Sequence, residues 1–265
     1  MVDTDLQEIA QIADRVEAQF RSEGSAESAI AWHSASRTDV GRVRHINQDA
    51  FLDSEEQRLW VVADGIGGQS RGDYASSTVV AQLRGFARQN SVLANLQDIE
   101  TRLQVAHEKC RTAFRKHRPG TTIAAMYAHG NYCFLLWAGD SRIYRLRDRK
   151  LEQLTQDHSM AQEKYARGEL TEQEMADHHT AHVLTRSVGA HRNLRLDMHY
   201  TPVQGGDRYL LCSDGLYNPA EFGQICSALG QGSPSDACDS LVDLALESGG
   251  RDNITVVIVD TSQPG

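Results

Sequence analysis

Four aspartates stand where an apolar run of strand length meets a turn. Asp64 follows residues 59–63, and Asp214 and Asp140 end or follow two further runs of this kind. Asp252 stands just ahead of the last run, residues 254–259. One Asp-Gly pair after a strand is most often an ordinary turn. Four carboxylates held rigidly at strand ends instead predict one polynuclear metal site, because Mg²⁺ and Mn²⁺ prefer carboxylate oxygens and water as ligands.

A fifth aspartate, Asp49, follows a segment that carries Arg44 five residues earlier. On an extended segment or tight bend, the Arg44 guanidinium could lie beside a metal-bound phosphate. Taken alone, the segment would be interpreted by default as one whose Arg42 and Arg44 are solvated charges on a strand face. Aspartates with an arginine suit metal-assisted hydrolysis of a phosphoester. Two cations clamp the phosphoryl oxygens and lower the pKa of a bridging water, and the resulting hydroxide attacks phosphorus in line.

The elements that must position these residues are predicted from hydrophobic spacing. Helices are expected at 73–87, 93–117 and 234–247. Strands are expected at 121–128, 132–138, 142–147 and 150–154, joined as two hairpins. Strands in succession after two helices do not fit a βαβ repeat and favour an antiparallel α+β fold. The strand at 31–38 is expected at a sheet edge, and the apolar strand at 254–259 in a sheet centre.

Residues 156–182 are polar, rich in histidine and weakly helical. His158, His178, His179 and His182 raise the alternative of a zinc site, but the helical His-Glu-x-x-His pattern of a metalloprotease is missing. Because the segment has no continuous apolar face, we expect a mobile flap beside the active site.

The N-terminal part of the chain differs from the rest. Residues 4–21 carry apolar side chains at helical spacing, and residues 22–28 are typical of a short flexible link. This amphipathic helix could bind a partner, but we expect it to pack on the body of the same chain. The predicted organisation is an N-terminal helix and linker at 1–30, followed by one catalytic domain at 31–262.

Composition excludes several classes of protein. The net charge of -9, without a basic stripe, argues against non-specific nucleic-acid binding. The five cysteines show no C-x-x-C spacing, so core thiols in a reducing cytosol are expected rather than disulfides. The acidic N-terminus does not resemble a secretory signal, and the apolar runs are shorter than the ~20 residues of a membrane helix. We therefore expect a cytoplasmic protein without membrane contact.

Seven short motifs occur in the order seen in metal-dependent Ser/Thr protein phosphatases, the type 2C or PPM family, and the chain resembles its bacterial branch. They are Arg44-x-x-Asn47-Gln48-Asp49, Val62-Ala-Asp64-Gly65-Ile-Gly-Gly68, Gly120-Thr-Thr122, Gly139-Asp-Ser-Arg142, Leu184-Thr-Arg-Ser-Val-Gly189, Ser213-Asp214-Gly215 and Arg251-Asp252-Asn253. The resemblance covers about residues 32–260. It implies a four-layer α-β-β-α sandwich with two central, mainly antiparallel sheets, a dinuclear Mn²⁺ or Mg²⁺ centre, and phosphoserine or phosphothreonine substrates.

The resemblance also implies roles for individual residues. Asp64 would bridge the two metals, with the Gly65 carbonyl as a further ligand. Asp214 and Asp252 would hold one metal, and Asp49 the other, directly or through water. The resemblance further implies that Asp140 binds a weaker third metal, that Arg44 binds the phosphate, and that the flap at 156–182 determines the choice of substrate.

Two residues depart from the pattern of many relatives. Ile66 stands where many members have a histidine proposed as the general acid, so that a metal-bound water is expected to take this role. Gln48 stands where a glutamate is frequent, which removes one negative charge. We therefore predict somewhat weaker cation binding and a need for millimolar Mn²⁺. Tight binding without Mn²⁺ preference in calorimetry would contradict this.

The expected function is a protein phosphatase that opposes a bacterial Ser/Thr kinase and acts as a monomer. Two alternatives remain open at this stage. One is a pseudophosphatase that binds phosphoproteins without turnover, although all the acidic ligands are present. The other is a phosphatase of the same fold that acts on another phosphoester or on an anti-anti-sigma-type regulator.

Overall fold

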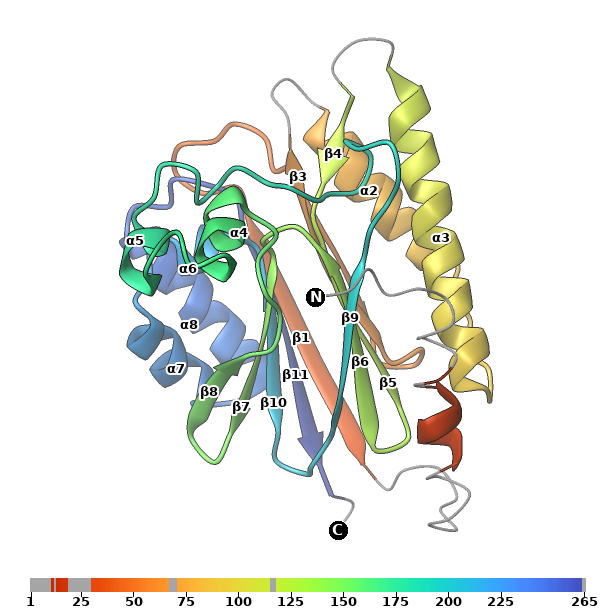
Figure 1. The fold of residues 1–265 in the computed structure, drawn as a ribbon. Helices are drawn as coiled ribbons and strands as arrows, with labels where there is room; N and C mark the ends of the chain where they lie inside the picture. The colour runs from red at the N-terminus through yellow and green to blue at the C-terminus, as the bar shows by residue number, and fades with distance from the viewer. Residues whose placement is uncertain (1–10, 12, 19–29, 67–70, 115–117, 264–265) are drawn as a thin grey trace.

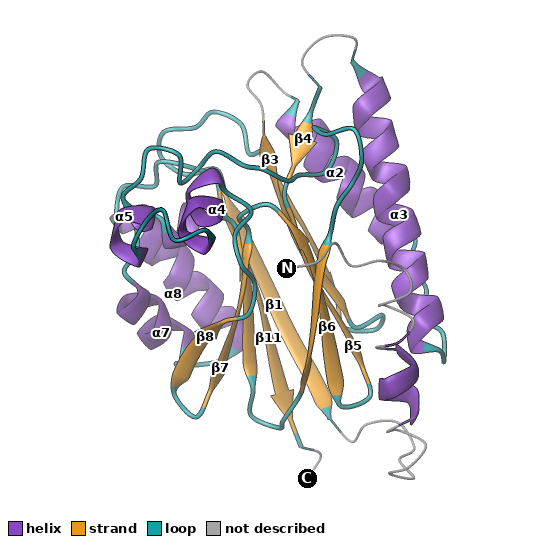
Figure 2. Ribbon diagram, in the orientation of Figure 1, coloured by secondary structure: helices purple, strands orange, loops and turns teal. Residues whose placement is uncertain are grey.

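The computed structural model describes residues 11, 13–18, 30–66, 71–114 and 118–263. Two sheets pack face to face in these residues, and helices cover both outer faces (Figures 1 and 2). All the ladders between the named strands are antiparallel. The predicted four-layer α-β-β-α sandwich is therefore confirmed.

The first sheet contains the C-terminal strand as an interior strand. Its order is β1 (Ala31–Asp39), β11 (Ile254–Ser262), β10 (Arg208–Cys212), β7 (Arg142–Arg147) and β8 (Lys150–Gln153). β11 is apolar on both faces and is covered on both, whereas β1 lies at the edge, as predicted. The β7–β8 hairpin turns at Asp148 and Arg149, which have positive φ angles of 50° and 62°.

The second sheet carries the other half of the chain. Its order is β2 (Asp49–Ser54), β3 (Leu59–Ile66), β5 (Ile123–His129), β6 (Tyr132–Ala138) and β9 (Asp197–Pro202). The short strand β4 (Gly120–Thr121) pairs with the end of β3. The predicted hairpin of β5 and β6 is present and turns at Gly130, whose φ is 56°.

Helices cover each sheet because apolar stripes on them match the apolar outer faces of the strands. α2 (Gly72–Leu83) and α3 (Val92–Ala113) share a core with the second sheet. α6 (Asp214–Tyr217), α7 (Phe222–Leu229) and α8 (Pro234–Glu247) share one with the first. The flap segment contains α4 (Met160–Ala166) and α5 (Glu172–Ala176), which lie over one end of the sandwich (Figure 1).

A third core fills the space between the two sheets. It includes Trp32 and Tyr209 from the first sheet and Trp60, Met126 and Trp137 from the second. Trp32 and Trp60 meet across the interface, with ring centroids 5.4 Å apart. Burial of these large rings helps to hold the two sheets together.

The described part of the N-terminal segment, residues 11 and 13–18, is helical. Ala13 and Val16 are buried in the core that α2, α3 and the second sheet share. This segment therefore packs on the body of the chain, as expected. The rest of the predicted helix at 4–21 and the link at 22–28 lie outside the described residues, and the domain boundary at residue 30 stays a prediction.

The described part of the chain contains no helix with the length and hydropathy needed to cross a membrane. All five cysteines are unpaired, and four of them are buried, as expected for core thiols.

Candidate functional site

Asp49 and Asp64 face each other across the β2–β3 ladder, where they are directly paired in register. The sequence predicted that this strand stops on Asp64 and is followed directly by a glycine turn, and the turn at Gly65 is wrong. β3 continues through Asp64 to Ile66, because Gly65 and Ile66 pair with Thr121 and Gly120 of β4. Asp64 is thus held within a ladder and not at the start of a turn.

Two neighbouring threonines hold the backbone of Asp64. Its N–H donates to Thr122 Oγ1 at 2.9 Å, and its carbonyl accepts from Thr122 N and from Thr121 Oγ1, both at 2.8 Å. The next residue must be a glycine, since a Cβ on Gly65 would lie 2.4 Å from the Gly72 carbonyl at the start of α2. The site is therefore rigid at this point.

Asp214 comes from the other sheet, at the end of β10. It begins the one-turn helix α6, where the sequence had indicated a turn, and Asn218 Nδ2 donates to its Oδ2 at 3.0 Å. The residue before it, Ser213, donates from Oγ to Asp49 Oδ2 at 2.7 Å. The hydroxyl next to Asp214 thus holds Asp49, a carboxylate of the opposite sheet.

Arg44 lies beside these carboxylates, as the sequence indicated. Its Nη2 contacts Asp252 Oδ2 at 2.7 Å, and 54% of its side chain is exposed. The hydrogen bond to Asp252 raises the pKa of Arg44. One arm of the guanidinium binds Asp252, and its remaining N–H groups face solvent. These N–H groups can donate hydrogen bonds to the oxygens of a phosphoryl group.

Asn253 ties this region together. Its Oδ1 accepts from Gln48 N at 2.8 Å, and its Nδ2 donates to the carbonyls of Val40 and Ile46 at 2.9 and 3.0 Å. The segment that carries Arg44 and Asp49 is therefore fastened to the residue next to Asp252.

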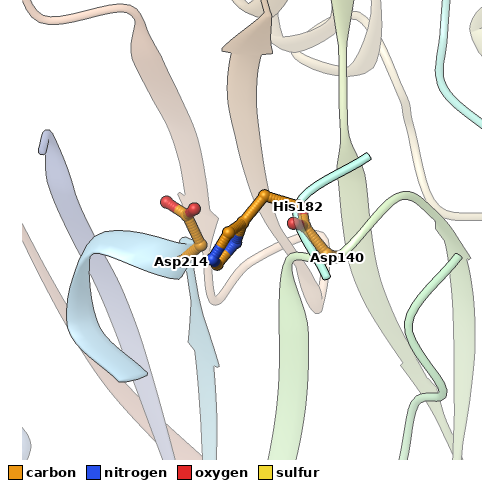
Figure 3. Close-up of side chains that lie close together, drawn as sticks. All are labelled: Asp140, His182 and Asp214. Atoms are coloured by element: carbon orange, nitrogen blue, oxygen red, sulfur yellow. The ribbon is translucent and has the colours of Figure 1, made fainter. Parts of the chain in front are cut away.

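Asp140 and Asp214 meet a histidine from the flap segment (Figure 3). One ligand atom each of Asp140, His182 and Asp214 lies within 4.8 Å of the other two, and Tyr217 Oη donates to the Asp140 carbonyl at 2.9 Å. The sequence singled out His182 only as one of four histidines that could form a zinc site. It did not place His182 with Asp140 and Asp214, because that contact depends on where the flap returns to the body.

His158 has a structural place instead. Its Nδ1 accepts from Gly139 N at 3.1 Å, its Nε2 contacts Asp197 Oδ2 at 3.2 Å, and its ring stacks on Trp137. These contacts fix the start of the flap against β6 and β9. The mobility expected of the flap stays a prediction.

Burial and the charges of neighbouring aspartates disfavour the ionised form of the carboxylates in the cluster. Burial raises the pKa of Asp49 to about 7 against the opposing hydrogen bond from Ser213. Burial, and then the charge of Asp214, raise the pKa of Asp140 to about 8. Burial raises the pKa of Asp64 well above its ordinary value, and the other four aspartates raise it further. Each of the other four predicted aspartates is therefore close enough to Asp64 to disfavour its negative charge.

This arrangement fits divalent cations. Buried carboxylates of like charge are stable only when protonated or paired with positive charge. Asp49 Oδ1 is buried and has no hydrogen-bond partner among the described residues, which leaves it available as a ligand. The donors are almost all carboxylate oxygens, the set that Mg²⁺ and Mn²⁺ prefer.

Comparison with known proteins agrees with this geometry. The family model for protein phosphatase 2C matches residues 41–233. The serine/threonine phosphatase Stp of Listeria innocua is 33% identical over 242 residues, which cover 86% of this chain and 95% of that protein.

Solved structures show the same likeness. The structure of PppA, described as a key regulatory component of T6SS in Pseudomonas aeruginosa, has a TM-score of 0.81 and 40% identity, and the match covers 87% of this chain and 97% of that one. The catalytic domain of the serine/threonine protein phosphatase PstP, in complex with two manganese ions, has a TM-score of 0.78 and 33% identity, with 88% and 99% covered. The chain therefore belongs to the protein phosphatase 2C, or PPM, family of serine/threonine phosphatases, in its bacterial branch.

Proposed function

We propose that this phosphatase removes phosphate from phosphoserine and phosphothreonine residues of proteins, with Mn²⁺ or Mg²⁺ as its cofactor. The observation that carries the proposal is the convergence of five aspartates and Arg44 at one end of the two sheets. The PstP catalytic domain, which is similar to this chain, binds two manganese ions.

The roles proposed for the carboxylates are those that the family resemblance implies. Asp64, with the Gly65 carbonyl, would contact both cations, Asp214 and Asp252 would hold one, and Asp49 the other. A third, weaker cation would take Asp140, Asp214 and His182, which already lie together. Divalent cations held by these residues would supply Lewis acidity, which lowers the pKa of water and neutralises the charge of phosphoryl oxygens.

The residues of the chain supply orientation and charge. Arg44, with one arm on Asp252, would hold the equatorial phosphoryl oxygens in line for attack and balance their charge in the transition state. Ser213 would hold Asp49 in one rotamer, because its hydroxyl donates to Oδ2. No side chain is assigned as the general acid, since Ile66 at the end of β3 carries no proton to donate.

The test is hydrolysis of p-nitrophenyl phosphate and of a phosphothreonine peptide with Mn²⁺, with Mg²⁺ and with EDTA. We expect activity that depends on the metal and falls by about 10²–10³-fold or more in Asp214→Asn. Asp239→Asn is the matched control, because Asp239 is an exposed aspartate of α8 that pairs with Arg37. Circular dichroism would establish that each variant folds.

Failure of all metals to support turnover by folded wild-type protein would favour the phosphoprotein-binding alternative. Turnover of small phosphomonoesters without turnover of phosphopeptides would favour a different substrate. A bacterial Ser/Thr kinase is the proposed opposing enzyme, because its products are the substrates proposed for this site.

A further inference from the structure

A cavity beside the candidate metal centre has no role in the mechanism above. Its volume is about 400 Å³, within the range of roughly 300–1,000 Å³ that is usual for ligand pockets. It lies between the one-turn helix α6, the C-terminal end of α8 and the turn that precedes β11. The residues that line it are Gly215, Asn218, Pro219, Ser248, Arg251 and Asp252.

Two of the lining side chains also belong to the candidate metal centre. Asp252 Oδ2 contacts Arg44 Nη2 at 2.7 Å, and Asn218 Nδ2 donates to Asp214 Oδ2 at 3.0 Å. The cavity and the carboxylate cluster therefore share a wall. A peptide whose phosphate lies at Arg44 would have its neighbouring residues at this cavity.

Arg251 gives the cavity a positive charge that is not yet used. It is exposed, and within the described residues its side chain makes no ion pair or hydrogen bond. The acidic residue of the lining, Asp252, is already paired with Arg44, and in the proposed function it also holds a cation. The guanidinium of Arg251 is therefore available to an anionic group of a ligand, in a chain whose net charge is -9.

The lining around Arg251 also offers a second donor on a fixed backbone. The hydroxyl of Ser248 has no hydrogen-bond partner in the part of the chain that the structure describes, and its N–H donates to the Leu244 carbonyl at 3.1 Å. Gly215 packs so closely on the neighbouring loop that a Cβ there would lie 1.9 Å from the Asn253 carbonyl oxygen. A ligand would thus meet two donors on a preorganised surface.

We propose that this cavity binds the carboxylate of a substrate residue that flanks the phosphorylated one, with Arg251 as its ion-pair partner and Ser248 as a second donor. The inference rests on the proposed function and assigns a substrate preference to it. Arg251 is a specificity residue in this account and does not touch the reacting phosphate, which lies at Arg44.

The test uses phosphothreonine peptides of one sequence, in which glutamate, glutamine or lysine is placed in turn at each of the three positions on either side of the phosphothreonine. With Mn²⁺ present, we expect wild type to show a kcat/KM about two- to fivefold higher for glutamate than for glutamine at one flanking position, the size of effect that an exposed ion pair has. Lysine should be the poorest residue there, and added salt should weaken the preference.

Variants of Arg251 show whether the preference comes from the cavity. In Arg251→Ser the ratio of kcat/KM for the glutamate and glutamine peptides should fall to about one, whereas Arg251→Lys should keep most of it. Arg251→Glu should prefer lysine to glutamate at the same position, as a direct ion pair requires. The ratio is compared because any effect of a variant on the metal ligands or on the reacting phosphate cancels in it. Arg84→Ser is the matched control, since Arg84 is an exposed arginine at the end of α2 that does not line the cavity.

Equal kcat/KM for glutamate and glutamine at every position would overturn the inference. A ratio that keeps its wild-type value in Arg251→Ser would overturn it too, and so would an equal loss in Arg84→Ser. Peptides in which a CH₂ group replaces the ester oxygen of the phosphothreonine cannot be hydrolysed, and their affinity, measured by fluorescence anisotropy, gives the same preference without turnover. A failure of the proposed function and a failure of this inference are therefore separate results.

Discussion

Asn253 illustrates how much of this site depends on side chains that bind neither metal nor substrate. It accepts one backbone N–H and donates to two carbonyls, all in the segment of residues 40–48. This segment leads to Asp49 and carries Arg44. A displaced segment would move both the carboxylate and the guanidinium away from the opposite sheet.

We expect Asn253→Ala to lower the free energy of unfolding by about 1–3 kcal/mol, because three backbone groups lose their partner. It should also weaken Mn²⁺ binding by about tenfold or more, as removal of a residue that orients metal ligands does. Thermal unfolding and calorimetric titration measure the two effects.

Asn95 offers the matched control. It is buried on α3, accepts from Gln89 N and donates to Gln89 O, both at 2.8 Å. Asn95→Ala should cost similar stability but leave Mn²⁺ affinity unchanged. Equal affinities of the two variants would show that Asn253 does not position the metal ligands.

At the scale of residues, the sequence predicts the carboxylates better than their surroundings. Asp64, Asp214 and Asp252 could be found because each adjoins an apolar run, a pattern that is local in the chain. The contacts that Ser213, Thr122 and His182 make could not be predicted from local pattern, since each acts across the fold: the contact of Ser213 with Asp49 spans 164 residues. The roles of the aspartates as ligands stay predictions.

Among the helices and strands, the N-terminal segment has an unexpected attachment. Glu17 Oε1 accepts from Val92 N at 2.9 Å and from Ser91 Oγ at 3.1 Å, at the first turn of α3. A carboxylate at this position satisfies an unpaired N–H and interacts favourably with the helix dipole. The N-terminal segment therefore caps a helix of the family core from outside that core.

We predict that Glu17→Ala lowers the free energy of unfolding by about 1 kcal/mol, the usual cost of a lost helix cap. Metal-dependent hydrolysis should not change, because α3 contributes no residue to the carboxylate cluster. Asp14→Ala serves as the control, since Asp14 is exposed on the same helical segment. A marked loss of activity in Glu17→Ala would indicate that the N-terminal segment acts on the site itself.

The helices and strands predicted best from the sequence are those long enough to show a regular spacing of apolar residues. α8 was expected at 234–247 and is observed as Pro234–Glu247. Its capping box at Ser233 and Asp236 and its initial proline are local signals. α6 and α7 were missed, because four and eight residues are too few for a helical repeat to show. The extension of β3 depends on β4, about 55 residues away, and has no local signal.

At the scale of the whole molecule, His107 couples α3 to the loop that follows the flap. It is buried, and its Nδ1 accepts from Gly189 N at 2.9 Å. Burial lowers the pKa of His107, so the unfolded chain binds the extra proton first as the pH falls below about 6.5. The contribution of His107 to stability is therefore present above this pH and is lost as the pH falls toward the lower pKa of the folded form.

We expect His107→Asn, which keeps an acceptor near the position of Nδ1, to be less stable than wild type at about pH 7.5. This deficit should shrink as the pH is lowered to about 5.5, because only wild type loses stability through this group. Urea unfolding of both proteins in EDTA at several pH values gives the difference. A deficit that stays constant with pH would show that His107 remains equally protonated in both states.

The core between the two sheets determines the intrinsic fluorescence of this protein. All three of its tryptophans lie there: Trp32 comes from one sheet, and Trp60 and Trp137 come from the other. An indole emits at longer wavelength once water reaches it. Separation of the two sheets, by acid or by denaturant, would therefore shift the intrinsic fluorescence to the red. Unwinding of the outer helices alone would leave the emission wavelength unchanged. One spectrum therefore distinguishes separation of the two sheets from unfolding of the helices that cover them.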